Sequence, residues 1–423
     1  MRPRFFGPGI LLAATSIGAS HILMSPEAGA RFGFALAWLV VAAHVVKYPA
    51  FAFAPRYVAA TGQSLLQAYE QAPGPRHWAI WLGLGDMTVQ ALGLIAGLIG
   101  LNASFLSAAV GGDTRLWALA LAAVLVAALA AGQYHWLRAT NLALVGGLTA
   151  GTLAAFWAAP PPPAALVESF MPALPAGSLF LVAAILGFMP TSVAVSVWQS
   201  LWAIEQRRAA GLPAPRTRQQ RLAALRHALL DLRIGYGLSL LLALLFLSLG
   251  ATLLQPRGLV PHGTDVAITL AQLYTLALGA WMKPVFLAVA ASALLSTCYT
   301  MMDGFPRAFV AAWRLARHSQ SNRPIGEDRR YWGFLLATTA SGMAIFAVVP
   351  DPALLVKAVG ALGLMLSPVY FALNLWAVTR RIDDPALRPG LTSIGMAIAG
   401  TLFMTLIAAL LLWTTFVASP NWA

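Results

Sequence analysis

One apolar segment of the chain carries a thioether and two hydroxyls beside a proline. Residues 183–199 read AAILGFMPTSVAVSVWQ, so Met189, Thr191 and Ser192 surround Pro190. Proline removes a backbone donor and clashes with the preceding turn, which predicts a helix that breaks in mid-membrane. Unwound backbone at that depth is tolerated only where it is buried in protein or lines a cavity. The alternative is a proline-kinked helix with a purely structural role.

A second interrupted segment lies near the N-terminus and carries a histidine. Residues 7–28 read GPGILLAATSIGASHILMSPEA, with His21 near the middle. Two Gly/Pro-interrupted spans in corresponding places of two halves point to the substrate site of a transporter. The sequence therefore predicts that substrate binds between these two segments.

The composition indicates an integral membrane protein. The 423 residues are 59% hydrophobic and 10% charged, and the mean hydropathy is +0.75. No soluble globular domain has this composition. The first apolar run begins directly after residues 1–4 and is long enough to span, so we expect no cleavable signal. A single cysteine, Cys298, excludes an intramolecular disulfide.

Apolar runs along the chain predict about eleven transmembrane helices. They lie near residues 8–28, 34–55, 78–105, 114–132, 139–158, 179–203, 234–254, 281–302, 332–349, 353–378 and 391–417. If the N-terminus is cytoplasmic, most arginines fall in inner loops, as the positive-inside rule requires. We therefore predict a multi-pass protein of the cell inner (plasma) membrane, with the N-terminus cytoplasmic and the C-terminus outside. The net charge of +13 is then a topology signal, and we expect no nucleic-acid partner.

The loops suggest two halves within one membrane domain. The basic stretch 205–233 is expected to be a cytoplasmic connector, and the prolines at 160–163 begin an external linker of polyproline character. Five spans precede this linker and six follow it, which fits an inverted repeat of five plus five with one helix left over. The predicted parts of the single domain 1–423 are 1–158 for the first repeat, 179–378 for the second repeat and 391–417 for the extra helix.

Several short motifs, in order along the chain, resemble landmarks of the NRAMP (natural resistance-associated macrophage protein) family of divalent-metal transporters. They are GPG at 7–9, AGARFG at 28–33, ATG at 60–62, MP at 189–190 and MDGF at 302–305. The resemblance implies an all-α membrane protein with the LeuT-like fold of the APC superfamily. It also implies a five-plus-five inverted repeat, broken helices 1 and 6, and alternating access.

The resemblance is weaker at the family's metal-binding positions. The family's first helix breaks at Asp-Pro-Gly-Asn, whose Asp and Asn ligate the metal, and here the matching residues 18–21 read GASH. The family's sixth helix carries Met-Pro-His, and here Met189 is kept while Thr191 replaces the histidine. A second family histidine falls at Ser196. The predicted substrate-binding residues are Gly18, Ala19, Ser20, His21, Gly187, Met189, Thr191 and Ser192.

The family's proton pathway is also altered. Asp86 matches an Asp of the family's third helix, but Val89 stands where the family has a Glu. A glutamine of the family's tenth helix corresponds to Pro368. Each departure removes a ligand or a proton carrier.

A site without a carboxylate favours a cargo other than a divalent metal ion. Burying a divalent ion without a formal counter-charge costs many kcal/mol more than in a site holding one carboxylate. The free amides and positive dipole ends of broken helices favour a small anionic group. The GAS sequence at 18–20 is similar to the small-residue breaks of LeuT-like amino-acid carriers, which bind a substrate carboxylate. We therefore predict a secondary transporter with a remodelled site that carries a small organic or anionic solute.

Two alternatives stay open. His21 and Met189 could ligate a soft or borderline ion, which would make the protein a proton-coupled transporter of divalent transition metals. The other alternative is a non-transporting membrane sensor or scaffold. The oligomeric state is left open.

Ionisable residues inside a membrane span are functional candidates by default. His21 and Asp86 are the candidates for proton coupling, since a histidine can exchange a proton near neutral pH. Asp86 is expected either to relay protons or to pair with Lys47 or His44. Lys47 is expected to extend toward the cytoplasmic end of the second span. With no phosphate-binding glycine loop, zinc spacing or nucleophile triad in the sequence, we expect neither an enzyme nor a cofactor.

Overall fold

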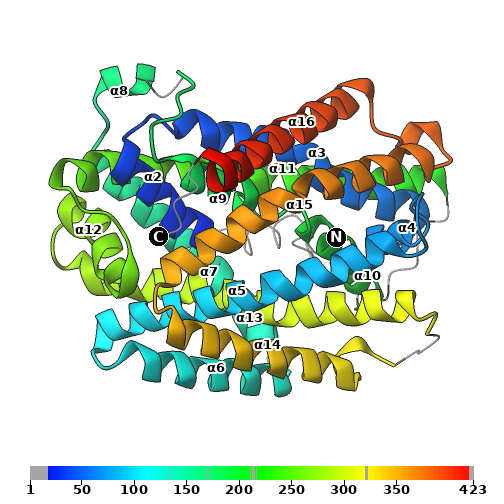
Figure 1. Ribbon diagram of the computed structural model, residues 1–423, viewed down its shortest axis with the longest axis horizontal. Helices are drawn as coiled ribbons and strands as arrows, with labels where there is room; N and C mark the ends of the chain where they lie inside the picture. Colours follow the sequence, from blue (N-terminus) through cyan, green and yellow to red (C-terminus); the bar gives the residue numbers. More distant parts are fainter. Residues whose placement is uncertain are drawn as a thin grey trace.

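The computed structural model describes residues 18–132, 134–168, 171–209, 211, 215, 217–319 and 323–418, with only the backbone for 134–145, 166–168, 206, 209 and 418. Every regular element in these ranges is helical, which confirms the predicted all-α class (Figure 1). The α-helices are α2 (Ser25–Phe32), α3 (Ala37–Thr61), α4 (Leu65–Tyr69), α5 (Trp78–Val110), α6 (Thr114–Ala130), α7 (Tyr134–Ala158), α8 (Pro163–Glu168), α9 (Leu179–Phe188), α10 (Val195–Ala209), α11 (Arg218–Leu249), α12 (Val266–Leu278), α13 (Met282–Ala316), α14 (Arg329–Val348), α15 (Pro352–Arg380) and α16 (Leu391–Trp413).

Short turns of other helical types extend or connect these helices. The π-helical turns are η1 (Ser20–Met24), η2 (Gly250–Leu254) and η7 (Thr414–Ala418), and the 3-10 turns are η3 (Gln255–Arg257), η4 (Gly263–Asp265), η5 (Ile325–Glu327) and η6 (Pro385–Leu387). Because η1 leads directly into α2, the first predicted span is helical from its middle onward. The beginning of that span, residues 8–17, lies outside the described residues.

The helices are long and apolar enough to make this a multi-pass membrane protein. Seven of them meet that description among the described residues, namely α3, α5, α11 with η2 and η3, α13, α14, α15 and α16 with η7. A helix satisfies all its backbone hydrogen bonds internally, which is the condition for crossing lipid. The other four predicted spans fall on α6, on α7, on the interrupted pair α9 and α10, and on η1 with α2.

The seventh span begins earlier than its hydropathy predicts. The apolar run starts near residue 234, but α11 begins at Arg218. Thr217 and Gln220 form a capping box, in which each side chain satisfies a backbone N–H of the other. Most of the basic stretch expected to be a connector is therefore a helical extension of this span.

Close packing sets the position of the interrupted sixth helix. Helix α9 lies against α15, while α5 runs beside α13, α14 and α15 (Figure 1). A Cβ atom on Gly187 would lie 1.8 Å from the carbonyl oxygen of Gly360. Only glycine fits at Gly187, because any side chain would collide with the backbone of α15. The end of α9 is thus fixed against a long, continuous helix.

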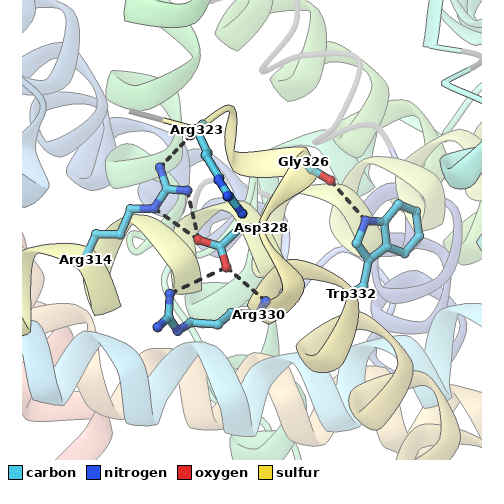
Figure 2. A network of polar contacts seen from close by, with 6 residues as sticks. All are labelled: Arg314, Arg323, Gly326, Asp328, Arg330 and Trp332. Carbon is cyan, nitrogen blue, oxygen red and sulfur yellow. Dashed lines mark hydrogen bonds and ion pairs between the residues drawn. The ribbon is translucent and has the colours of Figure 1, made fainter. Parts of the chain in front are cut away.

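Ion pairs join the end of α13 to the beginning of α14. Figure 2 shows the Asp328 carboxylate between Arg314 and Arg330. The shorter contact to Arg314 is 2.8 Å, the backbone N–H of Arg330 donates at 3.0 Å, and Arg314 also donates to the carbonyl of Arg323. Burial alone would raise the pKa of Asp328, but the hydrogen bonds from Arg330 and Arg314 and their charges lower it. The ionised carboxylate therefore stabilises this connection.

Replacing Asp328 by asparagine should remove a pH-dependent part of the stability. A lowered pKa stabilises the fold above the unfolded value of about 4, and this stability is lost as the pH falls through the folded pKa. We expect Asp328→Asn to lower the apparent Tm in detergent by about 1–3 °C at pH 7. The difference from wild type should shrink as the pH is lowered below about 4. Asp383→Asn, at an exposed carboxylate, is the control, and an equal loss in both variants would contradict the assignment.

Candidate substrate site

The sixth span is interrupted where the sequence predicts. Helix α9 ends at Phe188 and α10 begins at Val195, with Met189 in an extended conformation at the end of α9. The last carbonyls of an α-helix have no partner within the helix, and they form the negative end of its dipole. In a membrane these groups need a partner from elsewhere in the protein.

The partner is Lys47, at the middle of α3. Its Nζ atom donates to four backbone carbonyl oxygens, those of Leu186 at 2.9 Å, Gly187 at 3.1 Å, Met189 at 3.0 Å and Thr191 at 2.6 Å. The side chain has no exposed surface. The expectation that Lys47 extends toward the cytoplasm is therefore wrong. Its ammonium instead satisfies the carbonyls that the break leaves without a helical partner.

The first interruption is less extensive than predicted within the described residues. Gly18 is non-helical, but Ala19 is already in helical conformation and π-helix η1 starts at Ser20. A Cβ atom on Gly18 would lie 2.6 Å from the Thr297 hydroxyl oxygen of α13, so a larger residue would force that side chain to move. Of the four residues predicted to form the break, only Gly18 is unwound.

His21 is held by hydrogen bonds on both ring nitrogens. Its Nδ1 lies 2.9 Å from the Ser20 hydroxyl, and its Nε2 lies 2.8 Å from the Ser239 hydroxyl of α11. The same hydroxyl is 2.9 Å from Nε2 of His44, whose Nδ1 is 2.8 Å from the Val40 carbonyl. The Val40 carbonyl can only accept, so Nδ1 of His44 is the donor.

The Val40 carbonyl determines which atom donates in each of the following hydrogen bonds. With His44 neutral, its Nε2 accepts from Ser239, and Ser239 in turn accepts from Nε2–H of His21. Nδ1 of a neutral His21 then accepts from Ser20. Every ring nitrogen is used while both histidines stay uncharged. A metal ion needs a ring nitrogen with a free lone pair, so it would have to displace Ser20 from His21.

The two interruptions meet in space. The Ser20 hydroxyl lies 3.4 Å from the carbonyl oxygen of Pro190, so η1 and the sixth-span break are in contact. Met189 and Thr191 supply backbone carbonyls to Lys47, as does Gly187. Ser192 lies beside α15, where a Cβ atom on Gly363 would be 3.4 Å from its hydroxyl oxygen.

The whole candidate site is closed in this conformation. All eight predicted residues are buried, and the most exposed side chain among them, Ser192, has 2% of its surface accessible. Within the described residues no group of three or more His, Cys, Asp or Glu side chains could hold a metal ion. The site therefore offers carbonyls, hydroxyls, one thioether, the His21 imidazole and a buried ammonium.

Asp86 has partners other than those predicted. Its two carboxylate oxygens accept hydrogen bonds from Gln90 at 2.6 Å and from the Tyr370 hydroxyl at 2.7 Å. The expected pairing with Lys47 or His44 is wrong, because the Asp86 side chain of α5 faces α15. A proton-coupling role for Asp86 or His21 stays a prediction.

A second polar network reaches the position of the family's other histidine. The Asn374 amide of α15 donates to the Ser196 hydroxyl at 2.9 Å and accepts from the Tyr69 hydroxyl at 2.6 Å. Asn374 and Ser196 have no exposed surface. This network joins α4, α10 and α15.

An ion pair that the sequence reasoning missed joins α2 to α15. Glu27 of α2 is 1% exposed, and its Oε1 atom lies 2.7 Å from Nζ of Lys357 on α15 and 3.3 Å from Nη1 of Arg31. The sequence did contain a signal for this pair, since a carboxylate stands at the end of the first apolar run and a lysine at the start of the tenth apolar run. Two formal charges inside predicted spans suggest a mutual partner.

Two solved structures of transporters have the same arrangement of helices. The manganese transporter of Eremococcus coleocola superposes with a TM-score of 0.74, covering 98% of this chain and 87% of that chain at 15% identity. Mhp1, a nucleobase-cation-symport-1 family transporter, gives a TM-score of 0.59 over 97% of this chain and 93% of that chain at 14% identity. The fold is therefore the LeuT-like fold, as the motifs predict.

Sequence comparison gives the family. The profile described as natural resistance-associated macrophage protein-like matches residues 9–414. This chain belongs to the Nramp family. An uncharacterized protein of Pasteurella multocida is 28% identical over 337 residues, which is 75% of this chain and 72% of that protein. The divalent metal cation transporter MntH of Bacillus subtilis is 26% identical over 274 residues, 62% of this chain and 61% of that protein.

We expect the ion pair of Glu27 and Lys357 to stabilise the fold, so that removing one partner costs more stability than removing both. Glu27→Gln leaves the Lys357 ammonium buried without its closest carboxylate, and removing one partner of a buried pair costs about 3–5 kcal/mol. We expect a clear drop in apparent Tm in detergent for this single variant. The double variant with Lys357→Met should recover most of the loss, because it leaves no buried charge unpaired. Arg31, the other partner of Glu27, is exposed.

Lys283→Met, at an exposed lysine of α13, is the matched control and should leave the apparent Tm unchanged. A double variant no more stable than Glu27→Gln alone would show that the two charges do not stabilise each other.

Proposed function

We propose that this Nramp-family protein is a secondary transporter whose cargo is a small organic or anionic solute rather than a free divalent metal ion. Substrate would bind between residues 18–21 and residues 187–192, and alternating access would open this closed site to each side in turn. We also propose a plasma-membrane location with the N-terminus in the cytoplasm, on the strength of the arginine bias.

The observation that carries the proposal is the charge of the site. A buried ammonium, that of Lys47, lies in the sixth-span break, and among the described residues none of the ion pairs supplies it with a carboxylate. A divalent ion held about 4 Å from an ammonium is repelled by roughly 8 kcal/mol at an effective dielectric constant of about 20. A carboxylate at the same distance would be attracted by about half that amount. The sign of the charge thus favours an anionic group.

The hydrogen bonds on both ring nitrogens of His21 support the same conclusion. A metal would have to take Nδ1 of His21 from Ser20 and would gain only the Met189 thioether and neutral oxygens in exchange. Hard and borderline divalent ions need anionic or several strongly dipolar oxygens on leaving water. The alternative cargo is a divalent transition metal bound by His21 and Met189, which the names of the MntH relatives favour.

Uptake of Mn²⁺ into proteoliposomes separates these cargoes. With an inward proton gradient, we expect the wild-type protein to take up no more Mn²⁺ than empty liposomes, while the Eremococcus coleocola manganese transporter serves as the positive control. Robust uptake that His21→Ala and Met189→Ala abolish would overturn the proposal and establish metal transport.

A thermal-stability screen of small carboxylates and amino acids tests the other half of the proposal. At least one of them should raise the apparent Tm of the wild-type protein in detergent, since a ligand that binds only the folded state stabilises it. MnCl₂ in the same screen should have no such effect.

A further inference from the structure

We infer that the backbone carbonyls of Leu186, Gly187, Met189 and Thr191 form a monovalent-cation site, and that the Lys47 ammonium occupies this site as a covalently attached cation. The inference concerns what holds the break together and does not depend on what the transporter carries. It makes Lys47 a specificity-determining residue, because it fills a position that a free cation could otherwise take.

The contact geometry is that of a coordinated cation. An ammonium has three N–H donors, but four oxygens lie between 2.6 and 3.1 Å from Nζ of Lys47. At least one N–H is therefore shared between two carbonyls. Rings of backbone carbonyls that replace the hydration shell of a monovalent ion are the device of ion-selectivity filters.

The chain conformation explains why the oxygens converge. Leu186 and Gly187 lie in the last turn of α9, where carbonyls point along the helix axis without a partner. Met189 and Thr191 follow in non-helical backbone, which turns their carbonyls back toward the same point. The helix dipole adds negative potential at this end. Such a cluster would be repulsive without a positive charge in its centre.

The charge state follows from the same contacts. A neutral amine has only two N–H donors, and its lone pair would face a carbonyl oxygen, which is repulsive. Four acceptors and no donor around Nζ therefore require the ammonium form. A second cation cannot enter, since Lys47 has no exposed surface and already satisfies the four carbonyls.

Removing the amine should make the site available to a free ion. In Lys47→Ala the missing side chain leaves both space and four unsatisfied carbonyls. We expect the apparent Tm of this full-length variant in choline chloride to be several degrees below wild type. At equal ionic strength, one of NaCl, KCl or NH₄Cl should raise it by at least about 3 °C, as an ion that binds only the folded state does. The wild-type Tm should be the same in all four salts.

Two further variants test whether the recovery in salt needs both an empty space and the free carbonyls. Lys47→Met fills the space with an uncharged chain, so it should lose stability without recovering it in any salt. Lys47→Gln is one atom shorter than lysine and adds a carbonyl oxygen of its own, so it should respond to the same small cation as Lys47→Ala. If Lys47→Ala cannot be purified folded, Lys47→Gln decides the question.

The inference fails if neither Lys47→Ala nor Lys47→Gln is stabilised by any of the small cations over choline. It also fails if wild type responds as strongly as the variants, because the cation would then act elsewhere. Stabilisation of the wild-type protein by MnCl₂ would contradict the proposed function and leave the carbonyl site untouched, so the two failures are distinguishable.

Discussion

The contact between the Lys47 ammonium and four backbone carbonyls is the interaction on which the site depends. An interrupted helix inside a membrane leaves carbonyls that neither water nor lipid can satisfy. Here α3 supplies the missing charge, with oxygens 2.6 to 3.1 Å from Nζ. Gly187 allows the end of α9 to approach the backbone of α15, so the carbonyls are held in place. The Lys47 ammonium thereby satisfies the carbonyls of the break and brings a positive charge to it.

We propose that this charge accounts for the predicted departures from the family pattern as a connected set. On that proposal, a positive centre at the break disfavours a divalent metal, and the family's metal-binding Asp and His are not needed. Small residues and hydroxyls stand in their place, and His21 is hydrogen-bonded to Ser20 and Ser239. Two polar networks around the site, at Asp86 and at Asn374, are each satisfied by α15.

Local rules predicted the break itself, but its partner depends on tertiary packing. Pro190 and the apolar run around it were enough to predict an interrupted sixth helix. Nothing local shows that Lys47 faces the end of α9, because backbone carbonyls have no sequence signature. The partner of Asp86 depends on how α5 packs on α15. The start of α11 depends on a capping box that lies outside the apolar run. Lys47 and Glu27 were nevertheless visible as charges in apolar segments, which is the one signal that such sites give.

An experimental structure of the wild-type protein soaked in MnCl₂, with anomalous data collected near the manganese absorption edge, tests the central claim most directly. The account predicts density for the Lys47 side chain among the carbonyls of Leu186, Gly187, Met189 and Thr191, and no anomalous peak between His21 and Met189. A manganese peak at that position, with Lys47 displaced from the carbonyls, would contradict it.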